Sequence, residues 1–136
     1  MNWRTTALGI VLSLPSLGCM KMEPYPTTPH VVRTSLDPDK TYAAALRVFV
    51  RRGWGFGARD PAAHAIESEW VQLGSGPYQL SYRVLVGGGE IEVFTSCQIV
   101  LPPHPVQGCA IDERPAGTMA AEASLVADIL AEVQRL

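Results

Sequence analysis

Apolar and polar side chains alternate through much of the middle of the chain, as they do in strands that bury one face. The clearest alternation covers 78–101 and is interrupted at 87–89 by three glycines. Glycine accepts the positive φ of a tight hairpin turn without steric cost. Shorter strands are predicted at 31–36, 54–59 and 66–72. The pattern therefore indicates an antiparallel sheet that is covered on one side.

Two segments follow the helical period instead. The first begins at Asp37 and Pro38, which suit the N-cap and the first helical position, and runs to about Arg52, before Gly53. The second is predicted over 117–136. Its apolar stripe, which we expect to pack on the sheet, consists of Leu125, Val126, Ile129, Leu130, Val133 and Leu136. The opposite, solvated face is predicted to carry Glu122, Asp128, Glu132 and Arg135.

The order of these elements predicts one α+β domain over residues 31–136, an antiparallel sheet of three to five strands with two helices packed on one face. Trp70 is in phase with Ile66 and is therefore expected in the core. Trp54 and Phe56 lie between glycines and are harder to place. If exposed, they are the best candidates for a contact with a partner protein or peptidoglycan, because aromatic side chains dominate interface anchors.

The first eighteen residues have the layout of a bacterial export signal. Arg4 provides a basic start, and the apolar stretch 7–17 follows it. This stretch is shorter than the roughly 20 residues that a membrane-spanning helix needs. Gly18 is the small residue expected before a signal-peptide cut. We therefore expect residues 1–18 to be removed as a signal peptide.

The stretch 16–19, Ser-Leu-Gly-Cys, resembles the lipobox of bacterial lipoproteins, with serine where that family prefers leucine and with Pro15 just before it. The resemblance implies that Cys19 is acylated and that the lipid anchors the mature chain to a membrane of the cell envelope. Met20 stands where an aspartate tends to retain such proteins in the inner membrane, which favours the outer membrane, facing the periplasm. The alternative is an ordinary secretory signal that is cut near Cys19.

Residues 19–30 are predicted to form a tether between the acylated cysteine and the domain. Pro24, Pro26 and Pro29 favour an extended, polyproline-like conformation in this segment. At about 3.1 Å per residue such a segment reaches roughly 30 Å. The sequence thus predicts a domain that is held off the membrane.

The remaining cysteines, Cys97 and Cys109, are predicted to form a disulfide in an oxidising compartment. A hairpin centred on Pro103 places these two positions directly opposite each other. Directly opposed residues lie about 4.5–5.5 Å apart between Cα atoms, which is within the range of a disulfide. The alternative is a pair of buried thiols.

Composition and motifs mainly exclude functions. The formal net charge of the chain is −2, and nucleic acid is not expected as a partner because its binding requires neutralised phosphates. His30, His64 and His104 are the only histidines and lack the spacing of metal ligands. They are expected in solvated loops, with a site assembled in space as the alternative. No serine lies in a nucleophile elbow, so we expect no enzyme activity, no cofactor and no metal.

The residues that suggest a family are Tyr42, Leu46, Phe49, Arg52-Gly53-Trp54, Asp60, Ile66 and Trp70, followed by alternating strands and a final helix. This layout, over about residues 31–136, resembles the small repeated domain of the C-component lipoprotein of the outer-membrane β-barrel assembly machinery. That family has two such domains and a long unstructured arm, whereas this chain has one domain and a short tether.

An anchor and one compact domain without a catalytic set predict a non-enzymatic, lipid-anchored envelope protein. We expect it to act as a structural or protein-interaction module, with an envelope protein as its partner. The alternative is a periplasmic carrier of a small ligand or lipid, which would need an unfilled cavity between helices and sheet.

Overall fold

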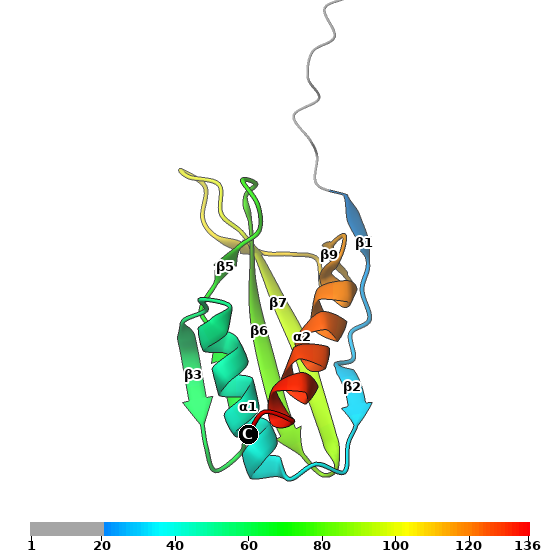
Figure 1. The fold of residues 1–136 in the computed structure, drawn as a ribbon. Coiled ribbons are helices and arrows are strands. Elements are labelled where there is room, and N and C mark those ends of the chain that lie inside the picture. Colours follow the sequence, from blue (N-terminus) through cyan, green and yellow to red (C-terminus); the bar gives the residue numbers. More distant parts are fainter. Residues whose placement is uncertain (1–20) are drawn as a thin grey trace, which may run out of the picture.

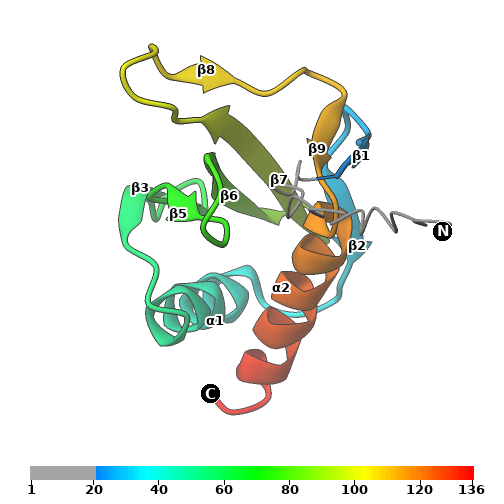
Figure 2. The same ribbon diagram turned by 90° about the horizontal axis from the view of Figure 1, so that it is seen from above.

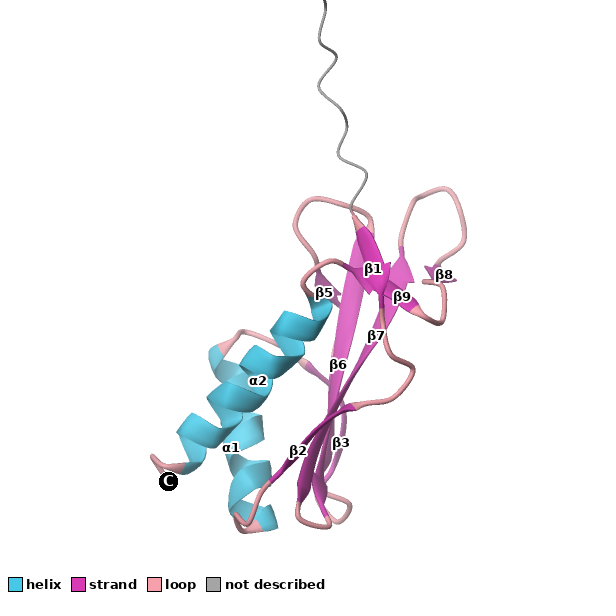
Figure 3. Ribbon diagram, turned by 90° about the vertical axis from the view of Figure 1, so that its right-hand side faces the viewer, coloured by secondary structure: helices cyan, strands magenta, loops and turns pink. Residues whose placement is uncertain are grey.

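Two helices cover one face of an antiparallel sheet in the computed structural model of the chain (Figure 1 and Figure 3). The structure describes residues 21–136. The predicted signal peptide, residues 1–18, and the predicted lipidation site Cys19 lie outside the described residues.

The helices are α1 (Pro38–Arg51) and α2 (Thr118–Val133). The strands are β1 (Met22–Pro24), β2 (His30–Arg33), β3 (Phe56–Asp60), β4 (Ala65–Ser68), β5 (Val71–Gln72), β6 (Tyr78–Gly87), β7 (Glu90–Ile99), β8 (Gln107–Gly108) and β9 (Glu113–Pro115). The main sheet has the order β2-β7-β6-β4-β3, and the short strands β5 and β8 add to β6 and β7. β1 and β9 form a separate two-stranded sheet. Seen from above, α1 and α2 lie on the same side of β6 and β7 (Figure 2).

This arrangement confirms the predicted α+β class, with antiparallel strands and both helices on one face. The main sheet has seven strands, more than the predicted three to five. The two additional strands, β5 and β8, contain two residues each. Such short strands leave little alternation in the sequence. The continuous path through the main sheet does contain five strands.

Local sequence signals explain the best-predicted boundaries. The side chain of Asp37 accepts a hydrogen bond from the backbone N–H of Lys40 at 3.0 Å, and Pro38 occupies the first helical position of α1. The chain leaves this helix at Gly53, where φ is +72°. Gly88 and Gly89, with φ of +60° and +75°, form the two-residue turn between β6 and β7.

The core lies between the sheet and the two helices. α1 contributes Val48 and Phe49, and α2 contributes Leu125 and Ile129. They pack with inward-facing residues of β4, β6 and β7, which are Ile66, Leu80, Tyr82, Val84, Val86, Ile91, Val93 and Cys97. The two long strands thus bury one face, as their alternation predicts.

The prediction of a free tether over residues 19–30 is wrong for its central part. Met22–Pro24 form β1, which pairs antiparallel with β9, and the side chain of Tyr25 is buried. The segment is extended, as its prolines predict. Its hydrogen-bond partners come from residues 112–116, and nothing in the local pattern indicates them.

Trp70 is 45 % exposed, and its predicted place in the core is wrong. The reason is an extra residue between β4 and β5. Glu67 pairs with Arg83 and Val71 pairs with Leu80, so four steps along this chain segment match three steps along β6. One extra residue turns the following side chains to the other face of the sheet.

Candidate functional site

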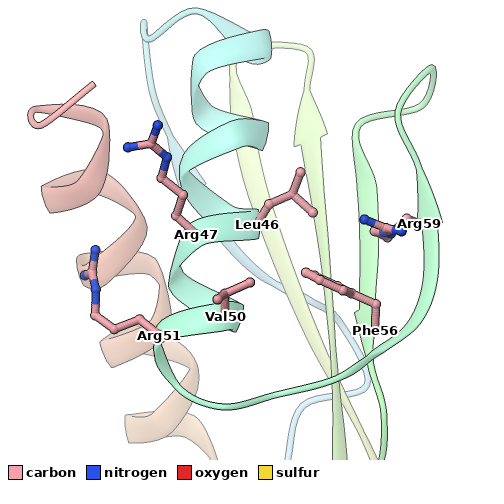
Figure 4. A pocket seen from close by; sticks show the side chains of 6 residues that line it. All are labelled: Leu46, Arg47, Val50, Arg51, Phe56 and Arg59. Atoms are coloured by element: carbon pink, nitrogen blue, oxygen red, sulfur yellow. The ribbon is translucent and has the colours of Figure 1, made fainter.

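A groove of about 350 Å³ lies between α1 and the edge strand β3. We call it the α1–β3 groove. Its lining residues are Leu46, Arg47, Val50, Arg51, Phe56 and Arg59. In Figure 4, Leu46 and Val50 point from α1 toward Phe56 at the start of β3. The groove therefore has an apolar floor made by two different elements.

Helical spacing explains why apolar side chains lie outside the core here. Leu46 and Val50 are four residues apart and share one face of α1, next to the face that buries Val48 and Phe49. Val50 is 65 % exposed. On the other wall, the ring of Phe56 stacks on the buried ring of Phe49, with centroids 6.1 Å apart. The floor is thus held in place by the core beneath it.

Arginines surround this floor, but they are not equivalent. Arg47 and Arg51 extend along the side of α1 that faces α2 (Figure 4). There they form ion pairs with Glu132 of α2, at 3.9 Å in the case of Arg47. The guanidinium of Arg59 lies 4.8 Å from the centre of the Phe56 ring and forms no salt bridge within residues 21–136. Arg59 is therefore the cation that the groove offers to a ligand.

The structure separates the two aromatic residues proposed as partner contacts. The half-buried Trp54 stacks on Tyr82 with centroids 4.5 Å apart, and Arg52 lies over it at 5.0 Å. Trp54 thus completes the core at the end of α1. Phe56 belongs to the floor of the α1–β3 groove.

Cys97 and Cys109 lie at disulfide distance, with Cα atoms 5.4 Å apart. β7 and β8 pair Gln98 with Gly108 and Ile99 with Gln107, which is the register expected for a hairpin centred on Pro103. The backbone N–H of Cys109 also donates to the carbonyl of Cys97 at 3.1 Å. The structure therefore brings the two cysteines within disulfide distance in the predicted register, although the returning strand is only two residues long.

A buried polar cluster that the sequence pattern does not predict lies at the opposite side of the domain. The carboxylate of Glu122 in α2 accepts hydrogen bonds from the hydroxyls of Tyr25 and Thr95, the latter at 2.6 Å. Arg114 lies 5.3 Å from the Tyr25 ring and donates to the backbone carbonyls of Thr95 and Ala110. We call these residues the Tyr25–Glu122 cluster.

The two glutamates predicted to be solvated are both buried, and their pKa values are shifted in opposite directions. Glu122 is 2 % exposed, and desolvation raises its pKa to about 7. Glu132 is also buried, but the hydrogen bond from Arg51 holds its pKa below the usual range. The helical period contains a signal for both positions. They lie three residues before Leu125 and three after Ile129, within the stripe that faces the core.

The carrier hypothesis requires space between the helices and the sheet. Phe49, Ile91, Leu125 and Ile129 fill the region between these layers and are each 0 % exposed. The α1–β3 groove lies outside this interface, at the edge of the sheet. The carrier hypothesis therefore gains no specific support.

The part of the chain that the structure describes contains no group of three or more histidine, cysteine, aspartate or glutamate side chains placed to hold a metal ion. His64 instead pairs with Asp39 at 2.7 Å. Within residues 21–136, neither helix has the length and hydropathy of a membrane span.

No model of a known protein family matches the chain, and no curated protein matches it either.

Proposed function

We propose that the chain is a non-enzymatic, lipid-anchored protein of the bacterial cell envelope that binds an envelope protein through the α1–β3 groove. Acylated Cys19 holds it in the outer membrane, facing the periplasm. The observation that carries the proposal is the apolar floor of the groove, where the largely exposed Val50 lies near Arg59 of the edge strand β3. Arg59 has no salt bridge within residues 21–136. Exposed apolar surface bordered by charge is typical of interaction sites.

The chemistry of the groove indicates the kind of segment that it binds. Leu46, Val50 and Phe56 favour one or two apolar side chains of the partner. Arg59 favours a carboxylate beside them, because its guanidinium has no acidic partner among the described residues. The partner segment is therefore apolar with acidic residues.

The test of the groove is cross-linking in intact cells followed by mass spectrometry, with two matched variants. Val50→Glu places a carboxylate on the apolar floor, and Leu85→Glu places one on the face of the sheet that the helices leave open. Both positions are exposed, at 65 % and 38 %, so both variants retain the core. We expect Val50→Glu to abolish the cross-link to the partner and Leu85→Glu to retain it. The reverse result would contradict the proposed site.

The anchor is tested separately. The protein extracted from membranes is expected to lack residues 1–18 and to carry acyl chains on Cys19, as measured by intact mass. Cys19→Ala is expected to release the protein into the soluble periplasmic fraction. A mature mass without acyl chains would contradict the anchor and leave the binding groove to be judged by its own variants.

A further inference from the structure

The polypeptide is tied to the domain immediately after the proposed lipidation site. The backbone N–H of Ala116 donates to the carbonyl of Lys21 at 2.9 Å, and β1 then pairs with β9. At the other end of β1, the N–H of Tyr25 donates to the carbonyl of Asp112 at 2.6 Å. The Tyr25 hydroxyl bonds to Glu122 in the buried cluster. Backbone and side chain together hold this segment on the domain.

This attachment leaves only a short length of chain between the lipid and the domain. Two Cα–Cα steps separate Cys19 from Lys21, which span about 8 Å at most. An acyl chain on Cys19 therefore brings this end of the domain to the membrane surface. This step rests on the proposed anchor, and it replaces the roughly 30 Å spacing of a free tether.

The same end of the molecule carries the connections that flank β1. Figure 1 and Figure 3 show the start of β1, the β5–β6 connection and the β7–β8 connection at one end of the domain. Residues 100–106 connect β7 to β8 and contain three prolines, with no Asp, Glu, Lys or Arg. Within them, Leu101 is 50 % and Val106 is 56 % exposed.

The loop that connects β7 to β8 is held in shape at its base. Cys97 and Cys109 join its two strands. The N–H of Val100 donates to the carbonyl of Pro77 at 2.8 Å, which joins the loop to the uncharged β5–β6 turn. A loop that is ordered in advance presents apolar side chains with a smaller entropic cost on binding.

We infer that the loop that carries Leu101 and Val106 is a membrane-contact surface and lies in the headgroup region of the bilayer holding Cys19. The occupant is a lipid surface because the patch lies at the end of the domain that the short connection to Cys19 brings to the membrane. Apolar side chains without nearby charge partition into this region of a bilayer. Lys21, at the start of β1, faces the same headgroups and favours anionic lipids.

The experiment uses the full acylated protein in phosphatidylethanolamine–phosphatidylglycerol vesicles, with or without brominated acyl chains. Val106→Trp adds a fluorescent reporter in the loop. Ala62→Trp is the matched control, because Ala62 is exposed in the β3–β4 turn at the opposite end (Figure 1). We expect brominated lipid to lower the added emission of Val106→Trp about twofold and to leave that of Ala62→Trp unchanged. Leu101→Trp is a second reporter in the same loop in case Val106→Trp is unstable, because Leu101 is also exposed.

The outcomes separate this inference from the anchor on which it rests. If the intact mass shows acylated Cys19 while both reporters respond no more than Ala62→Trp, the membrane-contact surface is wrong and the anchor stands. If the mass shows no acyl chain, the anchor is wrong and the inference fails with it. Selective quenching of either reporter on the acylated protein supports both the anchor and the membrane-contact surface.

Discussion

The helix α2 buries a glutamate near each end, and the two ends provide opposite surroundings. Glu122 lies among hydroxyl groups, including that of Tyr25 in the N-terminal segment. Glu132 lies among guanidinium groups, the closest being those of Arg51 and Arg135. Burial raises the pKa of Glu122 to about 7, whereas the Arg51 hydrogen bond lowers that of Glu132. One residue type on one helix thus binds a proton near neutral pH at one end and stays ionised at the other.

The comparison shows how distant segments decide the role of a side chain. The end with Glu122 is held to β1 and therefore to the chain that leads to Cys19. At the other end, Glu132 draws Arg47 and Arg51 toward α2, away from the floor of the α1–β3 groove. Glu122 bonds to the N-terminal segment through Tyr25, and Glu132 pairs with Arg47 and Arg51. Among the arginines of the groove, this leaves Arg59 without a salt bridge within residues 21–136.

The largest effect is expected from removing the side chain that joins β1 to α2. Tyr25→Ala leaves a cavity under β1 and takes one hydroxyl from Glu122, so we expect a loss of about 3–4 kcal/mol in the free energy of unfolding. Tyr25→Phe keeps the ring and is expected to cost about 1 kcal/mol. Urea unfolding measures both. Equal stability of Tyr25→Ala and the parent would show that the segment is not held by this cluster.

A smaller effect with a defined pH dependence is expected at Glu122. Its pKa is about 7 in the folded protein and near 4.5 in the unfolded chain. Between these two pH values the folded state therefore binds more protons than the unfolded state. Stability contributed by the protonated form is therefore present at low pH and lost as the pH rises toward 7. We expect a fall of about 2 kcal/mol between pH 5 and pH 8.

Glu122→Gln is expected to remove this dependence, because its amide does not titrate. Urea midpoints at pH 5 and pH 8 measure the difference for parent and variant. A parent stability that rises over this range while that of Glu122→Gln stays flat would contradict the assignment.

The smallest effect, with the opposite sign, is expected at Glu132. Its pKa is lowered, so its stabilising ion pairs are present above pH 4.5 and are lost as the pH falls through its lowered pKa. The arginines are half-exposed, and salt screens part of the interaction. Glu132→Gln is expected to flatten the acid limb of the stability curve and to make the parent's salt dependence disappear. Asp128→Asn, which removes the exposed pair with Arg52, is the matched control.

The elements that the sequence predicts well depend on neighbouring residues. Asp37, Pro38 and Gly53 determine the bounds of α1 through capping and positive φ, and Gly88 and Gly89 determine the central hairpin. The alternation that starts at Ile66 predicts the wrong face for Trp70, because a bulge between β4 and β5 adds one residue. The bulge is visible only in the pairing of β4 and β5 with β6.

The candidate sites divide in the same way. The positions of Cys97 and Cys109 follow from a hairpin register, and Phe56 was a candidate from its aromatic side chain. The place of Val50 and Arg59 in the groove depends on the approach of α1 to β3, and the pairing of Arg47 with Glu132 depends on the approach of α1 to α2. The linear pattern contains neither approach. The Tyr25–Glu122 cluster joins residues 97 positions apart.

The amino-acid pattern alone predicts the α+β class, the antiparallel order, the bounds of α1 and the register that brings the two cysteines together, because each depends on local backbone preferences or on a two-residue period. The pairing of β1 within the proline-rich segment and the burial of two glutamates of α2 depend on contacts between distant parts of the chain. A buried carboxylate is stable only where hydroxyl or guanidinium donors arrive from elsewhere in the chain, and the fold brings them there.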